Sequence, residues 1–125
     1  MGIHSDIARL HQKIRECEED ISELEEAREF LRQKHTIIQN EAYEPAKNFD
    51  ITCGEQFRGK LEEKAEDARY DITVKTEISQ NATLEFISQI DVTIERLREM
   101  ISKYEREIEQ LEEELRAREA SQNGE

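Results

Sequence analysis

Residues 3–24, IHSDIARLHQKIRECEEDISEL, carry apolar residues at alternating steps of four and three. This spacing is the heptad repeat of a coiled coil, in which every apolar residue lies on the same face of an α-helix. The series then continues through Arg28, Leu31, His35 and Ile38, with Ala27, Phe30 and Ile37 flanking it. Charged residues occupy the positions between. The sequence therefore predicts a first helix over about residues 3–41.

An irregular segment follows the first helix. Proline is disfavoured in the interior of a helix, and Pro45 also pushes the residue before it away from helical dihedral angles. The residues from Thr52 to Glu55 have the spacing of a capping box, which typically opens a helix. We therefore expect a linker over residues 42–53 and a second helix from about residue 54.

The second helix is predicted to span about residues 54–119, with residues 120–125 as a disordered tail. Residues 73–83 are rich in β-branched residues, Ser and Asn, which are mediocre helix formers, but they contain no Pro or Gly. A continuous helix is therefore favoured over a break there. Its apolar stripe is predicted to comprise Phe57, Leu61, Ala65, Ala68, Ile72, Ala82, Phe86, Ile90, Ile94, Leu97, Ile101, Tyr104, Ile108, Leu111 and Leu115. The expected fold class is all-α, a long antiparallel helical hairpin or coiled coil with unequal arms.

The composition argues against several classes of partner. The formal net charge is −13, so phosphate backbones and anionic membrane surfaces are repelled. No apolar run approaches the roughly 20 residues that span a bilayer, and the N-terminus lacks the features of a secretory signal. We expect a cytoplasmic protein, exported if at all with its partner by a route that needs no signal peptide.

The sequence contains no pattern typical of catalytic or metal-binding residues. Cys17 and Cys53 do not form a zinc motif or a disulfide framework. His4 and His11 are seven residues apart, whereas paired metal ligands on a helix usually lie four apart. The acidic clusters lack the spacing of a calcium loop, and no phosphate-binding glycine loop appears. The sequence therefore predicts no enzymatic activity, metal or cofactor.

The two predicted helices differ in length. With a tight connection, about 27 residues of the second helix have no counterpart in the first, which is roughly 40 Å of helix. This overhang would hold Leu97, Ile101, Tyr104, Ile108, Leu111 and Leu115. Six large apolar side chains in water would cost about 10 kcal/mol before entropy is subtracted. A partner helix is expected to cover them, unless a kink near residues 73–83 folds the overhang back.

Phe57-Arg58-Gly59, at the start of the second helix, resembles the Trp-x-Gly elbow of small type VII secretion proteins. With the heptads on both sides, the chain resembles the YwqH-like family of α-helical proteins associated with LXG toxins in Gram-positive bacteria. Phe57 keeps an aromatic anchor but lacks the indole donor. The Tyr-x-x-x-Asp/Glu export motif is absent, because Val74 and Ile108 stand four residues after Tyr70 and Tyr104.

This resemblance implies a function in protein binding. Family members bind the helical N-terminal LXG domain of a toxin, sometimes with a second small helical protein, and help present it to the type VII (Esx-type) machinery. Phe57 and Gly59 would form the elbow, and Leu97–Leu115 the surface laid against the partner. A missing Cβ at Gly59 would suit close approach of another backbone, unless the glycine is incidental.

Two alternatives remain open. The first is a self-associating structural coiled coil, in which two overhangs pair as a homodimer. The second is a prefoldin-like holdase, but that fold needs β-hairpins between its helices, and residues 42–53 are too few to supply them.

Overall fold

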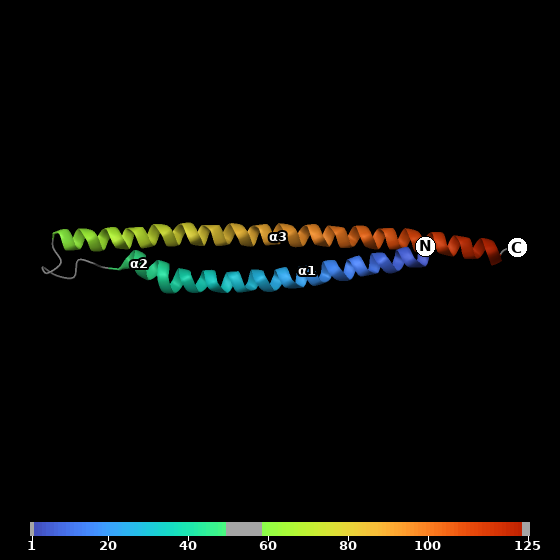
Figure 1. Ribbon diagram of the computed structural model, residues 1–125, viewed down its shortest axis with the longest axis horizontal. Coiled ribbons are helices and arrows are strands. Elements are labelled where there is room, and N and C mark those ends of the chain that lie inside the picture. The colour runs from blue at the N-terminus through green and yellow to red at the C-terminus, as the bar shows by residue number, and fades with distance from the viewer. Residues whose placement is uncertain (1, 50–58, 124–125) are drawn as a thin grey trace. The chain divides into compact units, whose positions relative to one another are not determined.

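The computed structural model describes residues 2–49 and 59–123. These residues form α1 (Ile3–Ile38), a short π-helix η1 (Gln39–Tyr43), α2 (Glu44–Asn48) and α3 (Lys60–Asn123). Figure 1 shows α1 and α3 side by side as the two long helices. The described residues form no β-strand. The predicted class, an all-α helical hairpin with unequal arms, is confirmed, with 36 residues in α1 and 64 in α3.

Helical structure runs past the predicted end at residue 41 and reaches Asn48. The prediction failed because the chain accommodates Pro45 in the first turn of α2, immediately after η1. A proline clashes with the carbonyl four residues before it, and it has no N–H to donate. In η1 the bond spacing widens from four residues to five, as in the bond from the Glu44 N–H to the Gln39 carbonyl. We attribute the tolerance of Pro45 to this wider turn.

The long helix α3 is unbroken from Lys60 to Asn123, which confirms the continuous helix favoured for residues 73–83. Thr73 and Thr83 donate their hydroxyl protons to carbonyls one turn earlier in the same helix, those of Arg69 and Ser79. Their hydroxyls are thereby satisfied without a break in the helix. The helix also includes residues 120–123, which were predicted as tail.

The chain divides into two compact units, each with its own helix packing. Unit 1 comprises Met1–Glu26 and Ile90–Glu125, and unit 2 comprises Ala27–Gln89. In unit 1 the predicted heptad faces meet, with Leu10, Cys17 and Ile21 of α1 buried. From α3 this unit buries Ile90, Ile94 and Ile108. Ile94 is only 1% exposed and is the most buried side chain described.

The predicted 27-residue overhang in α3 is wrong. In unit 1 the Lys13 ammonium lies 5.8 Å from the centre of the Tyr104 ring. Antiparallel helices in this register place Ile3 opposite about residue 114, not residue 92. Only beyond Leu115 is every described side chain exposed, over residues 116–122. The tight connection assumed from the sequence shifted the register by about 20 residues, because the first arm reaches Asn48 and α3 is described from Lys60.

In unit 2, the later part of α1, with η1 and α2, packs antiparallel to the first half of α3. The Nε2 of Gln80 donates to the His35 carbonyl, at 2.8 Å, and Arg69 Nη1 donates to the Lys47 carbonyl, at 3.0 Å. Residues earlier in α3 therefore bond to residues later in the first arm, as expected for antiparallel helices. These bonds set the register within unit 2.

Candidate protein-interaction surface

The inner face of α3 changes character along unit 2. At heptad spacing, the residues that turn toward the other arm are Arg69, Thr73, Thr76, Gln80, Thr83 and Ile87, all buried or half-buried. We call this row the inner seam. Five of its six members are polar, whereas Ile90 and the residues that continue the row in unit 1 are mostly apolar. A polar seam buries little apolar surface, so it must gain its stability from hydrogen bonds.

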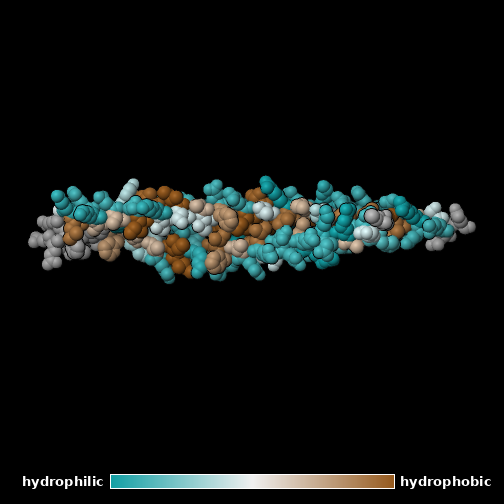
Figure 2. Space-filling model, viewed as in Figure 1, coloured by the Kyte–Doolittle hydropathy of each residue, from teal (hydrophilic) through white to brown (hydrophobic). Residues whose placement is uncertain are grey.

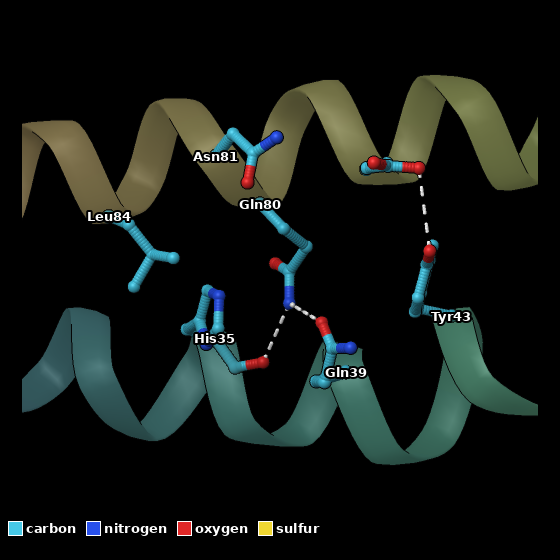
Figure 3. A pocket seen from close by; sticks show the side chains of 7 residues that line it. His35, Gln39, Tyr43, Gln80, Asn81 and Leu84 are labelled. Carbon is cyan, nitrogen blue, oxygen red and sulfur yellow. Dashed lines mark hydrogen bonds between the residues drawn. The ribbon is translucent and has the colours of Figure 1, made fainter.

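Gln80 is the centre of those hydrogen bonds. Its side chain is 4% exposed, and it is the one buried polar residue among those described. Besides the His35 carbonyl, its Nε2 donates to Gln39 Oε1, at 3.2 Å. Figure 3 shows Gln80 reaching from α3 between His35 and Gln39, in a pocket that Tyr43 and Leu84 also line. A buried polar residue at a core heptad position is a known means of fixing the register of paired helices.

The π-helix η1 positions the residues that receive α3 in this pocket. The inner row of the first arm runs His35, Gln39, Tyr43 rather than His35, Ile38. Ile38, which the heptad placed inside, is 39% exposed, because the extra residue per π-turn brings Gln39 inward instead. The Tyr43 hydroxyl then reaches Glu77 Oε2 of α3, at 3.4 Å.

Large apolar side chains of unit 2 lie outside the seam. Leu61, Ile72 and Phe86, which the sequence pattern placed in the core, are 56%, 54% and 54% exposed. Each stands one position before a residue of the inner face, as Phe86 does before Ile87. One residue turns an α-helix by about 100°, so this stripe lies on the side of the hairpin and not between its helices. Its assignment to the core was wrong by one position.

The same offset occurs in α1. Phe30 and Ile38 are exposed and stand one position before Leu31 and Gln39 of the inner row. Two antiparallel helices are related by a two-fold axis perpendicular to both, so the position before the seam faces the same side on each. We call this side the flank surface. It comprises Ala27, Phe30, Lys34 and Ile38 of α1 with Leu61, Ala65, Ala68, Ile72, Lys75, Ser79, Ala82 and Phe86 of α3.

Phe30 and Phe86 lie at nearly the same level of the flank surface. Phe30 precedes His35 by five residues, and Phe86 follows Gln80 by six, while Gln80 bonds to the His35 carbonyl. Lys34 lies next to this pair, with its ammonium 5.4 Å from the centre of the Phe30 ring. Figure 2 shows that hydrophobic side chains reach the surface of unit 2 among hydrophilic ones. An exposed apolar group on two neighbouring helices is typical of a protein-binding site.

The described residues that the sequence singled out for binding lie outside the flank surface. Phe57 and the capping box at residues 52–55 fall outside the described part of the chain. Ile108 is buried in unit 1, and the other members of the predicted seam there, Leu97, Ile101, Tyr104, Leu111 and Leu115, are half-buried. They form the apolar face that packs against the start of α1 within unit 1, so they are not an unpaired overhang.

Gly59 immediately precedes α3 rather than lying inside it. Its φ angle is +87°, a conformation that L side chains rarely adopt, and its carbonyl accepts the first helical bond from the Glu63 N–H, at 3.1 Å. A Cβ placed there would meet no atom of residues 2–49 or 60–123 within 4 Å. The positive φ angle is by itself a sufficient reason for glycine at this position.

The family comparison identifies the chain. The YwqH-like family model matches residues 2–120. The chain belongs to the YwqH-like family. No curated protein and no solved structure matches it. The inner seam and the flank surface of this YwqH-like protein both lie within the matched residues, so they belong to the family domain and not to an appended segment.

Groups that could carry chemistry are few in this YwqH-like chain. Across residues 2–49 and 59–123, no cluster of His, Cys, Asp or Glu could hold a metal ion. Burial raises the pKa of the Cys17 thiol, and Asp20, Glu16 and Glu18 raise it further, which keeps the thiol protonated. The hydrogen bond from Arg69 lowers the pKa of Glu66. Within the described helices, no segment has the length and apolar character needed to cross a membrane.

Proposed function

We propose that this YwqH-like protein is a non-enzymatic helical partner that binds the helical N-terminal LXG domain of a polymorphic toxin and helps target it to type VII secretion. It would act as an adaptor or chaperone-like factor in the cytoplasm of a Gram-positive bacterium. Any export of the chain itself would occur together with the toxin. The observation that carries the proposal is the flank surface in a chain of this family.

In unit 2, two helices pair through a polar seam while apolar side chains face outward, and this arrangement is suited to receive further helices. The flank residues Phe30, Ile38, Leu61, Ile72 and Phe86 are each between 39% and 57% exposed. Covering the exposed half of five such side chains would contribute about 5 kcal/mol. Association costs at least that much in lost freedom of motion, so a stable complex needs a partner that also covers neighbouring surface. A multi-helix domain such as an LXG domain supplies that surface.

Coexpression with the helical N-terminal domain of an LXG toxin from the same bacterium tests the proposal. We expect the two to copurify through a tag on the toxin domain and to run as one species whose mass, by light scattering, is that of a complex. The chain purified alone should be a monomer or a weak oligomer that dissociates on dilution. Failure to copurify, together with a lone chain of unchanging mass, would contradict the proposal.

The second candidate is a structural coiled coil that pairs with itself, because exposed apolar side chains on one flank could also pack against a second copy. It predicts a homodimer whose mass does not change on dilution and which an LXG domain does not displace. The same light-scattering measurement separates the two functions.

A further inference from the structure

The flank surface differs in charge from the rest of the protein. The chain carries 18 basic and 31 acidic residues, a net charge of −13. Yet the described positions that form the flank surface include two lysines, Lys34 and Lys75, and no Asp or Glu. Acidic residues of unit 2 stand at other helix positions, as Glu29 and Glu85 do. One carboxylate lies beside this surface, that of Asp71, which pairs with Lys75. The flank surface is therefore less acidic than the chain as a whole.

We infer that the flank surface binds one amphipathic helix whose apolar stripe is bordered by acidic side chains. This rests on the proposed function, for which it specifies the binding face and the chemistry of the partner. The apolar stripe of that helix would cover Phe30, Phe86 and Ile72 between the two helices of unit 2. Its carboxylates would meet Lys34 and Lys75, which currently contact the Phe30 ring and Asp71.

The two lysines are free enough to make these contacts. Lys75 holds Asp71 at 2.9 Å, but its side chain is 74% exposed, and such surface pairs contribute little. Lys34 lies against a ring that is itself 57% exposed. A carboxylate arriving over either lysine adds an ion pair where the binding helix excludes water, which strengthens the attraction.

A second copy of the chain fits this surface less well. If two copies met through the same flank, Lys34 and Lys75 would come together from both chains, and each copy would bring only the Asp71 carboxylate beside Lys75 to offset its two lysines. Like charges brought together in an interface disfavour that pairing and select for an acidic partner. Charge therefore distinguishes the acidic helix from self-association.

Two synthetic helical peptides test the inference. Both have four heptads with Leu at the two core positions and a fluorescent label. One has Glu at the positions bordering the Leu stripe, and the other has Lys there. Repulsion along each border keeps both peptides from pairing with themselves. Binding to the full chain is measured by fluorescence anisotropy at about 0.15 M salt, where distant charges are screened.

We expect the Glu-bordered peptide to bind at least threefold more tightly than the Lys-bordered one. This result is demanding, because a chain with a net charge of −13 attracts basic peptides in general. The double variant Lys34→Glu, Lys75→Glu should reverse the preference. Equal binding of the two peptides, tighter binding of the Lys-bordered peptide, or an unchanged preference in the double variant would overturn the inference.

A matched pair of isoleucines locates the surface. Ile72 and Ile78 are both exposed on α3, but only Ile72 belongs to the flank surface. Ile72→Ser should weaken binding of the Glu-bordered peptide about tenfold, and Ile78→Ser should leave it unchanged, with equal helix content by circular dichroism. Equal effects of the two would reject the flank surface. So would a homodimer that Phe86→Asp converts to a monomer, because the occupant would then be a second copy.

The toxin domain separates this inference from the proposed function. If the LXG domain binds but Ile72→Ser does not weaken the complex, the inference fails and the proposed function stands. If the Glu-bordered peptide binds as expected but the LXG domain does not, the proposed function fails and the surface stands.

Discussion

Phe86 and Ile87 are adjacent in sequence, and the structure assigns them opposite environments. The sequence pattern placed Phe86 in the core, whereas the structure leaves it 54% exposed and buries Ile87 to 6%. Truncation of a buried Ile to Ala costs about 2–5 kcal/mol. Full burial of a large apolar side chain contributes roughly 1.5–3 kcal/mol. Only about half of the Phe86 side chain is buried, so truncation can remove only about half of that contribution. We therefore expect Ile87→Ala to cost about 3 kcal/mol and Phe86→Ala about 1 kcal/mol.

Urea unfolding followed by circular dichroism measures both values. The midpoint should fall much further for Ile87→Ala, with the same denaturant dependence in both variants. In heat, the difference of about 2 kcal/mol should appear as roughly 6–12 °C in Tm for a chain of this size. Samples must be dilute, so that self-association does not stabilise either variant. A larger loss for Phe86→Ala would refute the one-residue offset, and with it the flank surface.

Three further predictions concern single groups. Gly59→Ala should lower the free energy of unfolding by about 1 kcal/mol, because Ala is strained at φ +87°; unchanged stability would contradict this. In a Cys53→Ser variant, Cys17 should react slowly with Ellman's reagent at pH 8 until urea is added, because burial raises its pKa and lowers the thiolate fraction; fast labelling of the folded chain would refute this. Arg69→Gln should return the lowered pKa of Glu66 to its ordinary value in an NMR titration. The stability linked to Glu66 is present above its ordinary pKa and is lost as pH falls through the lowered one; a pKa unaffected by Arg69→Gln would contradict its cause.

The heptads predicted much of the fold because, in unit 1, the residues at the apolar heptad positions are the ones that the structure buries. The row from Ile3 to Leu24 and the row from Ile90 to Leu115 both face inward there, as the spacing indicated. The register was not predictable, because it depends on where the first arm ends. Pro45 indicated an end before residue 45, and nothing in a heptad count indicates that a π-turn would carry the helix past it to Asn48.

The exposed apolar stripe of α3 was assigned to the core for a different reason. Apolar periodicity alone chose Leu61, Ile72 and Phe86 as core, although a second row at the same spacing, Thr73, Thr76, Gln80 and Thr83, stands one position later. With two such rows one position apart, the sequence does not show which of them a helix turns toward the other arm. What decides between them is whether the polar row finds partners, and that information lies in η1 and His35, far away in sequence.

The partners of Gln80 explain why unit 2 keeps the polar row inside. With the apolar row turned inward instead, about 100° of rotation would bring Phe86 between the helices, but it would expose Ile87 and take Gln80 away from the His35 carbonyl and Gln39. An inward apolar row would also pair in several registers, whereas Gln80 bonds well in one. Unit 2 built this way holds its own register through hydrogen bonds and keeps apolar side chains exposed on its flank. Replacing Gln80 by Leu would then give a chain of similar or higher stability with a less fixed register and a displaced flank surface.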